Sequence, residues 1–580
     1  NPLWIAQNDI DDSKFTRIIS NNLFEWETPI ENLRLGSRIN IDYQVYNYKI
    51  YRNRISGDGR GSNGYAWAAH RNNVTYVFAN TLDYTYNLNE DHQFDFTLVQ
   101  EYQKNRSLYL DGDGDNFATD GLTNLASAGN PTSASSSFSD WAVARYLGLM
   151  HYSGFQGRYV FDATYTREGN SRFAPAKRWG NFWSVGSAWN IHKESFMENF
   201  EYINNLKVRA SYGVTGNANI GLNSYQALFG FGGTYGGGGA INPASFGNSD
   251  LSWETSHTFD VGIDIGLFQN RISTSIGYYR RESKDLLLNV PLSLTTGFTS
   301  QTRNIGRMEN KGIEVEFNGD IVRSEDFNVS VGGNFATTQN EVLELAVDGN
   351  GQVINISGGS RQRTEVGQPV WAWHMQKWAG VDPANGDELY YINGKDGATT
   401  NNFNLAERAF QGGSAIPTFT GGLNVHVDYK GFFLDLNGYY ATGHKVYEDW
   451  HRYTNGTDFF STLYYQGVDA ILDRWQKPGD TGTRFGRMKA TTVPWQSHTK
   501  FLYDGTFFRL KNLTFGYDLD AEVLESIGVS SARFFVRGTN LFTWVKDDLL
   551  KYDPETDASG TAGLTTPPVK SFIFGINIKF

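Results

Sequence analysis

The amino-acid sequence predicts an all-β protein built as a large antiparallel transmembrane β-barrel. Three observations predict this fold. Segments in which apolar and polar residues alternate recur along the whole 580-residue chain. No apolar run reaches the about 18 residues that a membrane-spanning helix needs. Aromatic residues make up 15% of the chain, which also contains 63 glycines, as aromatic belts and many tight turns require.

The composition excludes several other classes of protein. The net charge of −12 argues against a nucleic-acid partner, because phosphate binding requires basic patches. Cysteine is absent, which excludes disulfides, thiolate metal ligands and thiol nucleophiles. The opening residues Asn1-Pro2-Leu3-Trp4 lack the basic and then apolar segments of a signal peptide. For an exported protein we therefore expect a targeting segment outside this sequence.

The segment Ser571–Phe580 shows the alternation most clearly. Successive side chains of a strand point to opposite sides, so every second residue shares a face. One face carries large apolar side chains, namely Phe572, Phe574, Ile576, Ile578 and Phe580. The other face is mostly polar. In a soluble sheet such an apolar face would pack on a core, so the recurrence of the pattern decides between a sandwich and a barrel.

The first part of the chain predicts strands separated by polar segments. Val74–Leu88 and His92–Gln103 form an antiparallel pair joined by the turn residues Asn89-Glu90-Asp91. A long polar loop is predicted from Asn105 to about Ser139. The segment Trp141–Tyr212 then predicts four more strands.

The predicted polar loop contains the most metal-like string of the chain. Asp111, Asp113 and Asp115 alternate with glycines, and such carboxylates suit an oxygen-preferring cation such as Ca²⁺. The string departs from the EF-hand pattern, because its sixth position is Asn116 and its twelfth is Leu122. A calcium ion in an extracellular loop and a solvated acidic loop both remain open.

The middle of the chain predicts a flexible loop and then a hairpin. The glycine-rich segment Asn217–Asn248 is expected to be too flexible for a strand, and its glycines do not follow a nucleotide-binding pattern. Trp253–Leu288 predicts a hairpin with a short turn at Gln269-Asn270. The apolar face of this hairpin consists of large residues, whereas the opposite face is rich in Gly, Ser and Asp, as in the water-filled lumen of a wide barrel.

The alternation continues to the end of the chain. Within Phe508–Leu519 the apolar residues change from even-numbered to odd-numbered positions, which we call a parity switch. One extra residue near Asn512 would cause this change, which predicts a β-bulge. The chain holds roughly 16 segments of the alternating type expected of an outer-membrane barrel. Short and long turns alternate between them, and one uninterrupted series of this length favours a barrel. The other segments are Gly312–Asn318, Phe327–Phe335, Leu423–Val427, Gly431–Tyr440 and Arg533–Asn540.

A series of short stretches along the chain carries a resemblance to a known family. The stretches are Tyr165–Phe173, Leu206–Asn217, Asn310–Glu314, Gly380–Asp387, Pro417–Gly422, Tyr429–Phe433, Arg474–Asp480, Phe508–Leu519, Arg533–Trp544, Tyr552–Glu555 and the terminal strand. In sequence and in order they resemble the SusC/RagA-type TonB-linked (TonB-dependent) outer-membrane transporters of Bacteroidetes. The resemblance implies a barrel of about 22 strands, with residues 1–580 as its C-terminal portion. We expect the first strands, the plug domain and the TonB box to lie outside this sequence.

The resemblance also implies a function and partners. Similar proteins import oligosaccharide or peptide nutrients together with a SusD-like surface lipoprotein, and TonB acts through the N-terminal region. The implied location is the outer membrane, with the strands in contact with lipid. The loops Tyr447–His498 and Lys546–Pro568 are expected to face outward and Phe580 to lie at the periplasmic rim. The terminal strand resembles the signal that the barrel-assembly machinery recognises.

Five loop aromatics are candidate ligand contacts. Indole and phenol rings stack well on sugar rings, but they serve equally well as interfacial anchors or in loop packing. Both possibilities remain open for these residues. They are Trp371, Trp373, Trp378, Trp450 and Tyr453.

Catalytic patterns are weak, and the sequence predicts neither an enzyme nor a catalytic cofactor. The chain contains no HExxH and no GxSxG motif. Glu314 and Glu316 share a strand face, but a hydrated barrel wall explains them better than an acid pair. Two alternatives to import remain. One is a transporter-like barrel that serves as a structural subunit of an outer-membrane assembly or secretion complex. The other is a β-rich surface glycan-binding protein that is soluble without detergent.

Overall fold

The computed structural model describes residues 2–348, 351–458, 465, 467–490, 496–519, 528–563 and 566–579. This part of the chain is nearly all β, with strands β1 to β32 and the short helices α1 (Pro2–Asn8) and α2 (His451–Thr454). Within it, no helix has the length and apolar character needed to cross a bilayer. The chain divides into two units. Unit 1 comprises residues 1–187, 212–256 and 285–304, and unit 2 comprises residues 188–211, 257–284 and 305–580.

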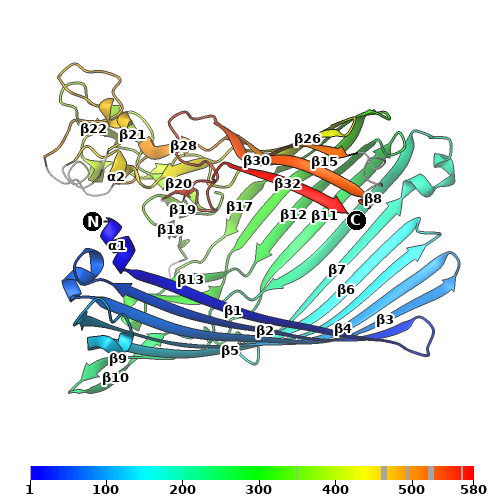
Figure 1. The fold of residues 1–580 in the computed structure, drawn as a ribbon, viewed down its shortest axis with the longest axis horizontal. Helices are drawn as coiled ribbons and strands as arrows, with labels where there is room; N and C mark the ends of the chain where they lie inside the picture. The colour runs from blue at the N-terminus through cyan, green and yellow to red at the C-terminus, as the bar shows by residue number, and fades with distance from the viewer. Residues whose placement is uncertain are drawn as a thin grey trace. The chain divides into compact units, whose positions relative to one another are not determined.

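The main feature of unit 1 is a ladder of long consecutive strands (Figure 1). Each strand pairs antiparallel with the next one along the chain. The pairing of β3 with β4 confirms the predicted pair, although both strands are longer than expected. Every strand of this ladder is longer than the roughly 9–11 residues that a tilted strand needs to cross a bilayer. The strands are β1 (Ile10–Glu27), β2 (Leu33–Arg52), β3 (Tyr65–Asn89), β4 (His92–Phe117), β5 (Ala128–Gly154) and β6 (Tyr159–Asn170).

The polar segment after Asn105 is not a long loop, so that prediction was wrong. β4 continues to Phe117 and β5 begins at Ala128. Asp111 and Asp113 pair with Ser135 and Ser133 across this ladder. Residues 111–116 are small or polar on both faces and show no apolar alternation, so only the pairing with β5 reveals this part of the strand. The predicted series Trp141–Tyr212 is matched by β5, β6, β7 (Trp179–Asn190) and β8 (Ile203–Asn217).

The glycine-rich segment 217–248 also contains strands, contrary to the expectation of a flexible loop. β9 (Leu228–Tyr235) and β10 (Gly238–Ser245) pair as an antiparallel hairpin. Gly236 and Gly237 form its turn with φ of 60° and 83°, which glycine adopts without steric cost. The glycines therefore build the turn. A second small hairpin in unit 1 consists of β13 (Leu287–Pro291) and β14 (Ser300–Asn304).

Unit 2 holds a second antiparallel series. Its strands pair in the order β12, β15, β16, β25, β26, β29, β30 and β32, and β17 also pairs with β15. The predicted hairpin corresponds to β11 and β12. Bounds are β11 (Glu254–Leu267), β12 (Ile272–Lys284), β15 (Arg307–Arg323), β16 (Phe327–Thr337), β17 (Gln339–Glu344), β25 (Phe419–Tyr429), β26 (Phe432–Thr442), β29 (Phe507–Leu519), β30 (Ser531–Val545) and β32 (Ser571–Lys579).

The predicted bulge in β29 is confirmed. The register of β29 against β30 shifts between Leu510 and Asn512, and the ladder with β26 shifts at the same place. One extra residue in β29 thus changes which face its side chains occupy. This bulge explains the parity switch in the sequence.

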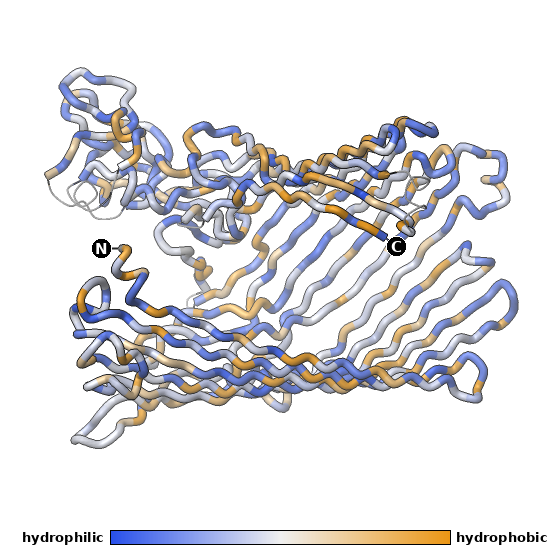
Figure 2. Tube along the Cα trace, in the orientation of Figure 1, coloured by the Kyte–Doolittle hydropathy of each residue, from blue (hydrophilic) through white to orange (hydrophobic). Residues whose placement is uncertain are grey.

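The apolar faces of the strands are exposed instead of covered by a core. Apolar and polar residues alternate along the long strands (Figure 2). On β32 the side chains of Phe572, Phe574, Ile576 and Ile578 are 50–77% exposed, while Phe580 lies outside the described residues. Water disfavours such a surface, whereas lipid accepts it. The strand faces therefore fit a membrane environment.

Short and long connections alternate along unit 2, as the sequence predicts. Lys430 and Gly431 alone join β25 to β26, whereas β26 and β29 are separated by residues 443–506. We call residues 345–418, 443–506 and 546–570 the loop cluster. It contains β18 (Ile356–Gly358), β19 (Gln362–Thr364), β20 (Ala372–Met375), β21 (Trp378–Val381), β22 (Glu388–Tyr391), β23 (Thr399–Thr400), β24 (Ala409–Phe410), β27 (Lys445–Glu448), β28 (Leu502–Asp504) and β31 (Thr561–Ala562).

Candidate ligand-binding site in the loop cluster

The loop cluster has a hydrophobic core of its own. Trp373 and Tyr447 are both 0% exposed, with ring centroids 6.1 Å apart. The guanidinium of Arg361 lies 5.0 Å from the Tyr447 ring. The burial of Trp373 fits the loop-packing alternative, and its ring is not accessible to a ligand in this structure. The other buried core residues are Met375, Ala415, Val446, Phe485, Phe501, Tyr503, Leu550 and Ala562.

The other four candidate aromatics retain some exposure. Trp371 is 38% exposed. Trp378 is half-buried, and its indole N–H donates to the carboxylate of Glu388. The rings of Trp450 and Tyr453 contact each other with centroids 4.4 Å apart and planes tilted by 36°. Contact between these four rings and a ligand remains a prediction.

An arginine of the barrel wall fixes the last part of the loop cluster. Arg509 of β29 has a side chain that is almost completely buried. Its Nη2 lies 2.6 Å and 2.7 Å from the two carboxylate oxygens of Asp553, and its Nη1 lies 2.9 Å from Glu555. Two stretches that carry the family resemblance, 508–519 and 552–555, therefore meet in one charged contact that positions the connection 546–570.

A buried ion pair joins the first residue of β22 to the segment just before β28. Nζ of Lys500 donates to Glu388 Oε1 at 2.7 Å, and the two side chains are 3% and 17% exposed. Glu388 also accepts from the backbone N–H of Gly486 at 3.0 Å. Burial lowers the pKa of Lys500, since a low-dielectric site disfavours the charged form. The partners are 112 residues apart, so nothing in the sequence spacing indicates this pair.

Two neutral histidines pack beside this pair. His451 stacks on Phe501 with centroids 3.9 Å apart, and its Nδ1 lies 2.7 Å from the carbonyl oxygen of Glu448. Burial lowers the pKa of His451 to about 4, and the positive charge of Lys500 acts in the same direction. Burial also lowers the pKa of His498 well below its ordinary value. Both rings are therefore uncharged at neutral pH.

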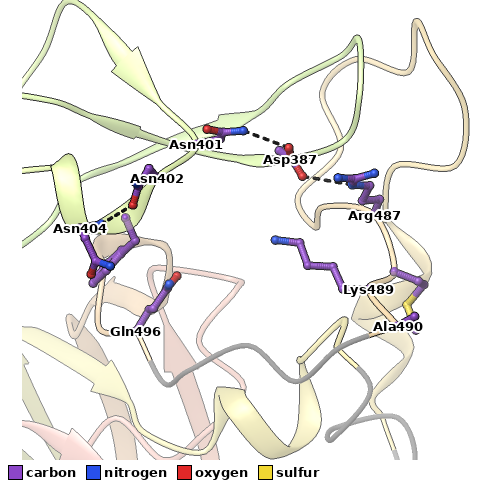
Figure 3. Close-up of a pocket in the computed structure, with 10 residues that line it drawn as sticks. Asp387, Asn401, Asn402, Asn404, Arg487, Lys489, Ala490 and Gln496 are labelled. Carbon is purple, nitrogen blue, oxygen red and sulfur yellow. Dashed lines mark hydrogen bonds and ion pairs between the residues drawn. The ribbon is translucent and has the colours of Figure 1, made fainter.

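A polar cavity of about 600 Å³ opens in the loop cluster (Figure 3). Three segments of the chain form it. The turn before β22 supplies Asp387, the segment after β23 supplies Asn401 to Asn404, and a third segment supplies Arg487 to Ala490 together with Gln496. We call this cavity the polar pocket. The sequence analysis missed it, because its residues come from distant parts of the chain.

The turn that presents Asp387 is fixed by a tryptophan. Gly386 has a φ of 77°, and a Cβ at this position would lie 2.5 Å from the indole of Trp475. Nε1 of Trp475 donates to the carbonyl oxygen of Pro383 at 3.0 Å. Asp382 accepts from Ala384 within the same turn at 2.9 Å. The stretches 380–387 and 474–480, both part of the family resemblance, therefore pack together and position the pocket wall.

The pocket contains one paired and one further cation. Oδ1 of Asp387 lies 3.1 Å from Arg487 Nε, and its Oδ2 accepts from the amide of Asn401 at 3.1 Å. The ammonium group of Lys489 points toward the interior of the pocket (Figure 3), and no carboxylate of the described residues forms an ion pair with it. The site therefore combines carboxamides with one net positive charge.

The aspartates proposed for calcium lie on a strand. Asp111, Asp113 and Asp115 occupy β4, where Asp115 accepts from Asn130 at 3.1 Å and Asp113 accepts from Thr132. Within the described part of the chain, no group of three His, Asp or Glu side chains is arranged to hold a metal ion. A calcium ion bound by these aspartates remains a prediction from sequence.

The sequence profile of the TonB dependent receptor-like, beta-barrel family matches residues 4–541. The chain belongs to this family. The confirmed resemblance places it in the outer membrane. The barrel fold and the exposed apolar strand faces also argue against a soluble glycan-binding protein.

Named relatives and a solved structure extend this result. The chain is 28% identical to the TonB-dependent receptor P3 of Formosa agariphila, over 100% of this chain and 60% of that protein. It is 25% identical to the TonB-dependent receptor SusC of Bacteroides thetaiotaomicron, over 76% of this chain and 44% of SusC. The fold matches the RagAB peptide transporter with a TM-score of 0.90 at 24% identity, over 100% of this chain and 63% of the matched chain. The chain thus spans about three-fifths of the length of P3.

Proposed function

We propose that the protein imports an oligosaccharide or peptide nutrient across the outer membrane, driven by TonB and assisted by a SusD-like surface lipoprotein. The observation that carries this proposal is the family match over residues 4–541. The relatives SusC and P3 are named TonB-dependent receptors, and the structural neighbour RagAB is named a peptide transporter. Residues 1–580 supply the C-terminal portion of the barrel and its long loops in this proposal.

The loop cluster supports a function in binding. An importer must first capture its ligand from water, which requires a preformed site on accessible loops. The polar pocket meets this requirement, since a packed turn holds Asp387 and its partner Arg487 in place. The core around Trp373 keeps the surrounding loops folded.

Uptake of labelled ligand by cells tests the proposal. Deletion of the gene is expected to abolish growth on, and uptake of, one class of oligosaccharide or peptide, and inactivation of TonB is expected to do the same. A strain that lacks an unrelated TonB-dependent receptor is the matched control. Uptake that continues without TonB would contradict the proposal.

The partner is tested separately by extraction in mild detergent and mass spectrometry of the purified complex. A single lipoprotein in stoichiometric amount is expected. Stoichiometric components of an assembly or secretion machinery would instead indicate a scaffold and would contradict import as the main function.

A further inference from the structure

We propose that the polar pocket binds the end of an acidic oligosaccharide, with Lys489 contacting a carboxylate or sulfate group of the sugar. This inference rests on the proposed import function and specifies its ligand. It is carried by the charge balance of the pocket, by its carboxamides and by its size. No aromatic residue predicted from the sequence lines this pocket.

The charge balance of the pocket favours an anion. Asp387 is the only carboxylate among the described residues that line the pocket, and it is engaged by Arg487 at 3.1 Å and by Asn401 at 3.1 Å. The backbone N–H of Lys489 donates to Thr457 at 2.7 Å, which fixes the main chain from which its side chain enters the pocket. A ligand anion would therefore meet an available ammonium group in a chain whose net charge is −12.

The carboxamides of the pocket suit sugar hydroxyls. Oδ1 of Asn402 accepts from the backbone N–H of Asn404 at 3.1 Å, and Oε1 of Gln496 accepts from Tyr390 at 3.2 Å. These contacts orient both amides and use only their oxygens, so each retains an NH₂ group as a donor. Asn404 adds a further carboxamide that offers a donor and an acceptor together, which matches hydroxyl groups, since these also donate and accept.

The lining of the pocket favours a saccharide over a peptide. Among the described residues that line it, the only apolar side chains are those of Phe403, Met488 and Ala490, whereas peptide side chains require apolar surface to contribute binding energy. The volume of about 600 Å³ lies within the roughly 300–1,000 Å³ of small-ligand sites. The pocket thus suits the terminal units of a chain, with the remainder of the sugar outside.

Calorimetric titration of the full-length protein in detergent tests this inference. The probes are trigalacturonate, a sulfated galactose trisaccharide, uncharged maltotriose and triglutamate. We expect at least one acidic saccharide to bind more tightly than maltotriose and triglutamate, and its affinity to fall with added salt, because salt screens charge contacts. The preferred acidic saccharide identifies the group as carboxylate or sulfate. Tighter binding of maltotriose or triglutamate, or no binding of either acidic saccharide, would overturn the inference.

Variants of the pocket locate the binding. Lys489→Gln is expected to lower the affinity for the acidic saccharide about tenfold, as the loss of a charged hydrogen bond does, whereas Lys489→Arg is expected to retain most of the affinity. Asn404→Asp places a negative charge beside the bound anion and is expected to lower the affinity by a similar factor. Lys395→Gln removes an exposed lysine outside the pocket and is the matched control. Equal affinity of the Lys489→Gln and control variants would overturn the inference.

The outcome also separates this inference from the import proposal. Binding in detergent requires neither TonB nor an energised membrane. Acidic saccharide that binds through Lys489 but is not taken up by cells would reject import and leave the pocket assignment intact. Uptake of an acidic saccharide that does not depend on Lys489 would reject the pocket assignment and leave import intact.

Discussion

Replacement of Lys500 by methionine tests whether the buried ion pair holds the loop cluster together. The substitution keeps an unbranched apolar side chain but removes the ammonium group, which lies 2.7 Å from Glu388 and 4.2 Å from the centroid of the Phe485 ring. The carboxylate of Glu388, only 17% exposed, would then lose its counter-charge. It would keep the hydrogen bonds from Gly486 and Trp378.

The expected cost follows from this geometry. Breaking a buried pair by removing one partner costs about 3–5 kcal/mol. The two remaining hydrogen bonds and the partial exposure of Glu388 place the Lys500→Met variant at the lower end, about 3 kcal/mol. Each 1.4 kcal/mol is a factor of ten in an equilibrium, so local opening becomes roughly 100-fold more frequent.

Hydrogen exchange followed by mass spectrometry measures this opening. Peptides that cover residues 378–391 and 496–504 are expected to exchange about 100-fold faster in Lys500→Met, while the β3–β4 ladder serves as the internal reference. The double variant Lys500→Met, Glu388→Gln removes both charges and is expected to recover most of the protection. Unchanged exchange in the single variant, or equal loss in both variants, would refute the reasoning.

Three further predictions concern the loops and the terminal strand. Acidification should loosen the loop cluster between about pH 6.5 and pH 4, because the unfolded state protonates its histidines near 6.5 while burial keeps the pKa of His451 at about 4. The loss from His451, about 3 kcal/mol when complete, should level off below that pH. Hydrogen-exchange rates of the loop cluster, measured in a pH series with His451→Leu as the comparison, check this prediction. Exchange rates that do not depend on pH in this range would contradict it. Gly386→Ala should destabilise the pocket turn by about 2 kcal/mol or more, because of its positive φ and the 2.5 Å approach to Trp475. Protease sensitivity of the segment 380–387 reports this change, and Gly397→Ala, at a positive φ with open space around it, controls for strain alone. Deletion of Phe580 should lower the amount of folded barrel in the membrane without altering ligand binding, and unchanged levels in a heat-modifiability assay would argue against an assembly signal in this strand.

The sequence predicted the membrane strands because their pattern is local. The alternation in Ser571–Phe580 needs no knowledge of a partner, and the parity switch near Asn512 located the bulge of β29 from a dozen residues. The prediction failed where this local pattern is missing. Residues 111–116 and 130–137 consist of small and polar residues on both faces, and only the pairing of Asp113 with Ser133 and its neighbours makes them strands.

The amino-acid sequence alone identifies an all-β membrane protein of the TonB-dependent receptor type, because the strand period and the order of the family motifs can be read along the chain. The candidate site, in contrast, depends on contacts that exist only in the folded protein. The tertiary structure buries Trp373, one of five similar loop aromatics, by packing it on Tyr447. It brings Asp387 to Arg487 across 100 residues and places Lys489 beside four carboxamides in the polar pocket. Contacts between distant segments leave no periodic pattern in the sequence. They are found only in the folded protein, as in the packing of Trp475 against Gly386.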